Sequence, residues 1–243
     1  MRFLELTLPT PEENLACDEA LLDLCEENGH DEILRFWESP AHFIVLGYSN
    51  KTATEVNLDV ARRHGVPVLR RCSGGGAVLQ GTGCLNYTVI LRIPDTGPLA
   101  GITTTNTYVL QRHRAALAPV VGQAARLSTV VVKGHSDLAR GTLKFSGNAQ
   151  RRKRRCLLFH GTFLHGLDIE LVERLLPMPS RQPDYRCNRR HREFLTNLAC
   201  DTASLKNVLR DHWNATEPFT DLPESRIAAL ARRYSSDDWN FKF

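Results

Sequence analysis

Two blocks of the sequence combine residue types that could do chemistry on an anionic substrate. The first runs Arg70-Arg-Cys-Ser-Gly-Gly-Gly-Ala-Val-Leu-Gln-Gly-Thr-Gly-Cys-Leu-Asn-Tyr87 and places three consecutive glycines between two apolar runs. Glycine lacks Cβ, so its peptide N–H groups can approach a phosphate or a narrow chain closely, at an entropic cost of roughly 0.5–1 kcal/mol per residue. We interpret this block as a binding loop, with a glycine-rich hairpin turn as the alternative.

The second block runs Lys144-Phe-Ser-Gly-Asn-Ala-Gln150 and is followed by five basic residues, 151–155, and by His160-Gly-Thr162. Lys144 lies on an expected strand, where an inward-pointing cation needs an anionic partner because unpaired burial costs several kcal/mol. A bound carboxylate or phosphate would supply that partner, and a solvent-facing lysine is the alternative. The neighbouring Ser-Gly-Asn adds hydrogen-bonding groups and a close backbone approach, so this block predicts an anion site.

The elements that must position these blocks alternate irregularly along the chain. Thr10 and Pro11 have the pattern of a helix start, and residues 1–9 that of an edge strand. Further strands are expected at 33–37, 43–48, 66–71, 77–80, 85–93, 128–132, 137–140, 142–146 and 156–164, and helices at 57–65, 103–118, 169–176 and twice after residue 205. Closely spaced strands predict an α+β fold with a mainly antiparallel mixed sheet flanked by helices. We expect a catalytic domain over 1–200 and a helical tail over 201–243 packed on it.

Composition excludes several classes of protein. The chain has 243 residues, 42% of them hydrophobic, and no apolar run near the roughly 18 residues of a membrane helix. Its first residues lack the pattern of a secretory signal. Seven scattered cysteines without a Cys-x-x-Cys pair argue against a disulfide framework or a zinc site, so we place the chain in the cytoplasm with reduced thiols. A net charge of +4 does not require nucleic acid.

Taken together, the two blocks resemble the lipoate-protein ligase family, which is related to biotin ligases and octanoyl transferases. The family's signatures are Arg-Arg-x-Ser-Gly-Gly-Gly with a downstream Leu-Asn-Tyr, and Lys-x-Ser-Gly-x-Ala-Gln with a downstream His-Gly-Thr. Ser136-Asp137-Leu138 looks like the family's Asn-Asp-Leu, with serine for asparagine, and Thr196-Asn197-Leu198 looks like its closing element. The resemblance extends from the first helix to about Leu198.

The resemblance implies a reaction in two steps. Lipoate would be activated by ATP to lipoyl-AMP, and the lipoyl group would then pass to a lysine of a lipoyl carrier domain, with Mg²⁺ bound mainly through ATP. Lys144 is the implied catalytic residue, because a fixed ammonium stabilises charge at the carboxylate and the α-phosphate. The implied substrate-binding residues are Arg70, Ser73, Gly74, Gly75, Gly76, Asn86, Ser146, Gly147, His160, Gly161 and Thr162. The implied nucleotide-binding residues are Ala77, Val78, Asp137, Lys144 and Asn148.

A transferase that takes a ready-made acyl donor resembles the same family but needs a cysteine nucleophile. One class of transferase carries its cysteine in a Pro-Cys-Gly element beyond the His-Gly segment, where this chain reads Pro177-Met-Pro-Ser180. Another class places it near the stretch that here reads His135-Ser136-Asp137. Cys72, Cys84 and Cys156 lie close to the motifs but within β-like runs, which favours small core residues.

Other functions remain open as alternatives. Biotin ligation would call for a Gly-Arg-Gly-Arg type of loop, which the chain lacks. A nucleic-acid-binding protein could use the basic run 151–155, although a solvated turn or a docking site for an acidic acceptor domain explains that run equally well. The polar segment 183–191 is a candidate lid. No length is left for the accessory domain of many family ligases, so activation proceeds without it, a separate accessory polypeptide supplies it, or the protein only transfers acyl groups.

Overall fold

The fold is built on two β-sheets. The structure, a computed structural model, describes residues 1–29, 32–124 and 129–243, and for residues 122–124 it describes the backbone only. The large sheet has eight strands in the order β11-β1-β2-β6-β10-β9-β8-β7. Their bounds are β1 Arg2–Glu5, β2 Ile33–Trp37, β6 Cys84–Arg92, β7 Val130–Lys133, β8 Asp137–Arg140, β9 Leu143–Arg152, β10 Cys156–Leu164 and β11 Glu217–Pro218. All neighbours pair antiparallel except β1, which is parallel to both β2 and β11. The predicted α+β class with a mainly antiparallel sheet is confirmed.

The small sheet has the order β4-β3-β5 and carries the glycine-rich block. Its strands are β3 Phe43–Leu46, β4 Val68–Arg70 and β5 Val78–Gln80. Because β4 and β5 lie on opposite sides of β3, the loop between them crosses from one edge of β3 to the other. The alternative prediction of a hairpin turn is therefore wrong, since the two strands that flank the glycines do not pair with each other.

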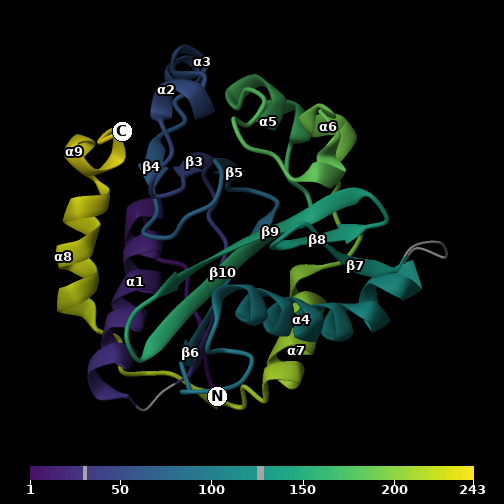
Figure 1. The fold of residues 1–243 in the computed structure, drawn as a ribbon. Coiled ribbons are helices and arrows are strands. Elements are labelled where there is room, and N and C mark those ends of the chain that lie inside the picture. Colours follow the sequence, from purple (N-terminus) through teal and green to yellow (C-terminus); the bar gives the residue numbers. More distant parts are fainter. Residues whose placement is uncertain (30–31, 125–128) are drawn as a thin grey trace.

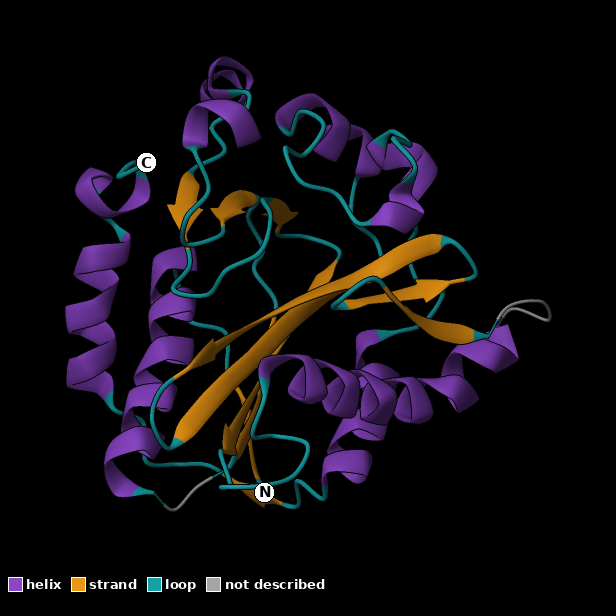
Figure 2. Cartoon of the chain, viewed as in Figure 1, coloured by secondary structure: helices purple, strands orange, loops and turns teal. Residues whose placement is uncertain are grey.

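Helices cover both faces of the large sheet (Figures 1 and 2). On one face, α1 (Pro11–Asn28) packs against β6 and β10 and also contacts α8 (Glu224–Tyr234). On the other face, α4 (Ile102–Ala124) and α7 (Thr202–Trp213) pack against each other and onto the sheet. The strands alternate accordingly: Leu34 and Phe36 contribute to the α4 core, whereas Ile33 and Trp37 contribute to the α1 core.

Short helices complete the chain near the small sheet and the end of β9 and β10 (Figure 1). They are α2 Thr52–Glu55, α3 Leu58–Arg63, α5 Ile169–Leu175, the 3₁₀ turn Asp184–Arg186, α6 His191–Phe194 and α9 Asp237–Asn240. Apolar residues of α3 and α5 share a third core with the small sheet, for example Ala61, Val172 and Leu46. This packing holds the segment after α5 against the end of the large sheet.

At the N-terminus, the predicted helix start is confirmed, whereas the predicted edge strand is not. Thr10 caps α1 through a hydrogen bond from the N–H of Glu13, whose own side chain returns to the N–H of Thr10. The prediction of an edge strand at 1–9 is wrong for Arg2 and Phe3, because β11 pairs outside them. The predicted strand at 128–132 appears as β7, although Ser128 lies outside the described residues.

The helices after residue 200 do not form a separate layer. α7 packs on α4, α8 packs on α1, and α9 contacts β4. The division into a domain over 1–200 and a tail over 201–243 stays a prediction. No helix in the described ranges is both long enough and apolar enough to cross a membrane.

Candidate active site

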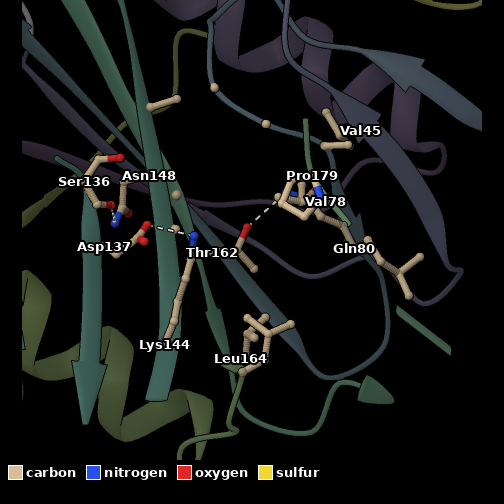
Figure 3. A pocket seen from close by; sticks show the side chains of 18 of the residues that line it. Val45, Val78, Gln80, Ser136, Asp137, Lys144, Asn148, Thr162, Leu164 and Pro179 are labelled. Atoms are coloured by element: carbon tan, nitrogen blue, oxygen red, sulfur yellow. Dashed lines mark hydrogen bonds and ion pairs between the residues drawn. The ribbon is translucent and has the colours of Figure 1, made fainter. Parts of the chain in front are cut away.

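A cavity of about 880 Å³ opens between the large sheet, the small sheet and the segment 179–186. Lys144 and Asp137 face each other on one side of it, and Val45, Val78 and Gln80 of the small sheet lie on the other (Figure 3). This volume falls in the range of about 300–1,000 Å³ that is typical of ligand sites. Both predicted blocks therefore meet at one cavity, although at least 68 residues of sequence separate Lys144 from the three consecutive glycines, 74–76.

One row of residues across five strands forms the floor of the cavity. In register, Trp37 on β2 pairs with Asn86 on β6, Asn86 with Thr162 on β10, Thr162 with Gly147 on β9, and Gly147 with Asp137 on β8. All five residues line the cavity. Since strands lie about 4.8 Å apart, the floor from Gly147 to Trp37 spans roughly 14 Å, which accommodates an extended octanoyl-length chain.

Lys144 lies directly over Gly147 at one end of this floor. A register shift between Leu138 and Ala139 places Lys144 and Gly147 on the same side of β9, and a Cβ on Gly147 would lie 2.8 Å from the ammonium nitrogen. The Lys144 Nζ is 2.7 Å from Asp137 Oδ1, and the Lys144 side chain is 23% exposed. The inward cation thus has an anionic protein partner and remains open to the cavity.

Tyr185 joins this ion pair from the far wall. Its hydroxyl donates to Asp137 Oδ2 at 2.8 Å, and its ring packs beside Phe194. Burial and the neighbouring Asp137 carboxylate raise the pKa of Tyr185, so the phenol stays protonated and acts as a donor. The segment predicted as a lid therefore contacts the Lys144–Asp137 pair, while lid motion stays a prediction.

Arg71 holds the shape of the glycine loop, which we define as residues 71–76. Its guanidinium donates to the carbonyls of Gly74 at 2.5 Å and Gly76 at 2.9 Å. Burial lowers the pKa of Arg71 to about 10, which leaves the group charged at neutral pH. Gly75 has φ +93°, and a Cβ there would lie 2.7 Å from Arg71 Nη2. A Cβ on Gly47 would lie 2.0 Å from the Gly75 carbonyl oxygen, so the two turns are in direct contact.

Arg70, in contrast, points away from the cavity. Its buried guanidinium donates to backbone carbonyls of Gly47, Asn50, Trp239 and Asn240. Burial lowers its pKa. Sequence reasoning selected Arg70 and passed over the neighbouring Arg71, because alternation along a three-residue strand cannot show which of two adjacent arginines faces the site.

A chain of buried polar groups runs from α1 to the glycine loop. Asp18 on α1 pairs with the buried Arg35 at 2.5 Å, and its other oxygen is 3.7 Å from His160 Nδ1. The opposite ring nitrogen of His160 is 2.6 Å from Ser73 Oγ, which accepts a hydrogen bond from Arg71 Nε at 3.1 Å. Burial acts to raise the pKa of Asp18, but Arg35 and His160 hold it below its ordinary value, so Asp18 is anionic.

Gly161 of the His-Gly-Thr motif makes room for a hydrogen bond between Tyr87 and Asn148. Tyr87, Gly161 and Asn148 are aligned on adjacent strands β6, β10 and β9. The Tyr87 hydroxyl donates to Asn148 Oδ1, and Asn148 Nδ2 donates to the carbonyl of Ser136 at 2.8 Å. A Cβ on Gly161 would lie only 1.8 Å from Asn148 Oδ1. The absent side chain lets the tyrosine reach across β10 to support the turn that carries Asp137.

The structure brings most of the predicted site residues to the cavity. Those that line it are Gly75, Gly76, Ala77, Val78, Asn86, Asp137, Lys144, Gly147, Asn148, His160, Gly161 and Thr162. Those that do not line it are Arg70, Ser73, Gly74 and Ser146. Their roles in binding or catalysis stay predictions. Lining residues that the sequence reasoning missed include Asp18, Trp37 and Arg71, and only the Arg-Arg pair offered a signal for any of them, whereas Tyr185 belongs to the segment predicted as a lid.

The cysteines lie elsewhere. All seven fall in the described part of the chain, and none of them lines the cavity or forms a disulfide. Burial raises the pKa of Cys72 and of Cys84 to about 12, which keeps both as neutral thiols. The interpretation of these two as buried core residues agrees with their exposures of 6% and 1%.

The basic run 151–155 is largely occupied by contacts within the protein. Lys153 pairs with Asp23 at 2.5 Å, Arg152 donates to the carbonyl of Leu99 at 2.7 Å, and Arg155 donates to the carbonyl of Glu26. Three of the five basic side chains therefore stabilise the β9–β10 turn against its neighbours, which does not favour a nucleic-acid patch.

The geometry can now be compared with known proteins. A family model described as the lipoyl protein ligase A/B catalytic domain matches residues 10–210. The chain belongs to this family. It is therefore an enzyme of the lipoate ligase and octanoyltransferase group.

Some relatives are named as octanoyltransferases and others as lipoate-protein ligases. The octanoyltransferase LipM of Geobacillus kaustophilus is 29% identical over 99% of this chain and 98% of its own length. A putative lipoate-protein ligase A of Aeropyrum pernix is 35% identical over 72% of this chain and 61% of its own length. In fold, the chain is similar to a bi-partite lipoate protein ligase from Thermoplasma acidophilum, solved in a study that included its E2 lipoyl domain, with a TM-score of 0.82, 23% identity and coverage of 99% and 95%.

Proposed function

We propose that the chain is a lipoate-protein ligase that activates lipoate with ATP and transfers the lipoyl group to a lysine of a lipoyl carrier domain. The observation that carries this proposal is the composition of the cavity wall. Among the described residues that line the cavity, Lys144 is the only lysine, and no cysteine is present. Transfer through a covalent thioester needs a thiolate beside the acyl group, whereas transfer through an adenylate needs only positive charge and orientation.

In the first step, the lipoate carboxylate would attack the α-phosphate of ATP, and pyrophosphate would leave. Lys144 Nζ would lie at the junction of carboxylate and phosphate, where a preorganised ammonium stabilises the charge that develops. Asp137, 2.7 Å from the ammonium, would hold it in place. The acyl chain would lie along the floor from Gly147 toward Trp37, between the two sheets.

In the second step, the amine of the carrier lysine would attack the acyl carbon, the amide bond would form, and AMP would leave. The Lys144 ammonium would then stabilise the phosphate of the departing AMP. No group of three or more His, Cys, Asp or Glu side chains in the described residues could hold a metal ion alone. Magnesium would enter mainly with the phosphates of ATP, and Asp137, which lies beside Lys144, is a cavity carboxylate that could contact it.

The second candidate function is an octanoyl or lipoyl transferase, which the full-length similarity to LipM favours. It would use a ready-made acyl donor and a thiol brought in from outside the cavity wall. We also propose that a separate accessory polypeptide assists activation, which the bi-partite ligase of Thermoplasma acidophilum supports. The seven cysteines without a disulfide agree with a cytoplasmic setting.

One assay separates the candidates. The purified chain is given ATP, Mg²⁺, lipoate and a lipoyl carrier domain, and pyrophosphate release and carrier mass are measured, with and without an accessory polypeptide. We expect both signals in the wild type and a loss of at least 100-fold (about 2.7 kcal/mol of barrier) in Lys144→Ala, the size typical of losing one preorganised charge.

Lys153→Ala is the matched control, because this lysine pairs with Asp23 outside the cavity wall and should leave both signals unchanged. Labelling that needs an octanoylated carrier protein, persists without ATP and disappears on substitution of one cysteine would establish the transferase instead.

A further inference from the structure

A continuous chain of polar contacts joins α1 to the glycine loop. Ser73 Oγ accepts from Arg71 Nε at 3.1 Å and shares a hydrogen bond of 2.6 Å with His160 Nε2. The other ring nitrogen, Nδ1, faces the Asp18 carboxylate 3.7 Å away. Asp18 is in turn balanced by the buried Arg35.

His160 Nε2 is occupied by the hydrogen bond with Ser73, and Nδ1 is directed toward Asp18. Both ring nitrogens face protein groups, and the side chain is only 12% exposed although it lines the cavity. The resemblance to the ligase family implies a substrate contact at this position. The geometry instead directs both polar atoms of the ring into the protein.

The chain ends on the glycine loop and controls its shape. Ser73 is 1% exposed and receives one donor of the Arg71 guanidinium, while the other donors of that guanidinium hold the carbonyls of Gly74 and Gly76. Arg71 Nε also donates to the Gly74 carbonyl at 3.1 Å, so the guanidinium stays tied to the loop without Ser73. Loss of the His160 contact would instead free Ser73, itself a loop residue, from its tie to β10 and α1. The three glycines are themselves exposed, and the turn at Gly47 and the hydrogen bond from the Tyr48 N–H to the Ser73 carbonyl at 2.8 Å support the loop from below.

We propose that His160 and Asp18 are positioning residues that hold the glycine loop over the cavity through Ser73, without touching the substrate. The effect on the loop follows from these contacts alone. The effect on catalysis rests on the proposed ligase function.

Two substitutions of His160 separate its contact with Ser73 from its contact with Asp18. In His160→Gln, the side-chain amide reaches the position of Nε2 and can still accept from Ser73. In His160→Asn, the shorter amide reaches only the position of Nδ1, so it keeps the contact with Asp18 and loses Ser73. Hydrogen exchange of the loop amides, followed by mass spectrometry on the free protein, reports the shape of the loop without any assay of activity.

We expect loop exchange to accelerate about tenfold in His160→Asn, the factor that corresponds to one hydrogen bond of ~1.4 kcal/mol, and to change little in His160→Gln. Ser73→Ala should accelerate exchange as much as His160→Asn, and the double variant should show no further change, since both break the same link. KM for ATP and lipoate should rise in the variants with a mobile loop, with a smaller effect on kcat. His165→Asn, outside the cavity wall, is the control.

Three results would overturn the proposal. Unchanged loop exchange with lost activity in both His160 variants would show a substrate contact. A fall in melting temperature with uniformly faster exchange across the chain would show a purely structural role. Additive effects of Ser73→Ala and His160→Asn would show two independent contacts. If no acyl transfer is detected in the wild type, the proposed function fails while the exchange data still decide the role of His160.

Discussion

The sharpest stability prediction concerns Gly161→Ala. This glycine has no side chain at the point where the Tyr87 hydroxyl crosses β10 to reach Asn148. The added methyl carbon would lie 1.8 Å from Asn148 Oδ1 and 2.9 Å from the Gly147 carbonyl oxygen. Both distances are far below van der Waals contact, so the Asn148 amide must move away and release Tyr87 and Ser136.

The cost can be estimated from two effects. Forcing a methyl group into a packed site costs about 1–3 kcal/mol. Leaving the hydroxyl of Tyr87, a residue only 1% exposed, without an acceptor costs about 1–3 kcal/mol more. We therefore expect a loss of roughly 4 kcal/mol of unfolding free energy. For a chain of this length, that corresponds to a fall in melting temperature of about 10 °C.

The measurement is urea unfolding of the four proteins of a double-mutant cycle, namely the wild type, Gly161→Ala, Asn148→Ala and the double variant. Gly161→Ala should lose much less stability in an Asn148→Ala background than in the wild type, because the atom it strikes first is gone. Gly166→Ala is the matched control, since its Cβ would meet nothing closer than 3.6 Å. We expect the control to change stability by less than about 1 kcal/mol.

The reasoning is refuted if Gly161→Ala is as mild as Gly166→Ala. It is also refuted if the loss is the same with and without the Asn148 side chain. Either outcome would mean that the glycine is present for another reason, such as the approach of a substrate.

Three further predictions test other parts of the structure. Gly75→Ala should destabilise the chain by about 1–3 kcal/mol in thermal unfolding because its φ of +93° is strained for any side chain, whereas Gly76→Ala, which meets nothing within 4 Å, should not. Iodoacetamide at pH 8 should modify the exposed Cys187 in peptide mass maps and leave Cys72 intact, because burial raises the pKa of Cys72 to about 12; rapid Cys72 labelling would contradict this. Burial lowers the pKa of His113 to about 3, so below pH 6.5 the unfolded chain binds a proton that the folded chain does not, and stability should fall by about 1.4 kcal/mol per pH unit from this group. In acid titrations followed by circular dichroism, His113→Gln should reduce the dependence of stability on pH. An unchanged dependence would refute the assignment of this loss of stability to His113.

Local chemistry accounts for what could be predicted from the chain alone. The capping pattern at Thr10 and the apolar runs of β2, β6 and β10 are properties of neighbouring residues, and the helix start and the three strands appear in the structure where expected. The resemblance of two motifs, Lys-x-Ser-Gly and Ser-Gly-Gly-Gly, indicated the family, and both motifs place glycine where a close approach is expected. At Gly147 and Gly75 the structure shows that approach in atomic distances.

What the sequence by itself determined was therefore the class of fold, the family and the two motif blocks that meet at the cavity. Only the tertiary structure decided which arginine faces the loop, that β4 and β5 flank β3 instead of pairing, and that Asp18 lies behind His160. The physical reason is that these relations join residues far apart along the chain. The contacts of Arg70 with Asn240, the strand order of the small sheet and the packing of α1 against β10 set them, and no local pattern encodes any of the three.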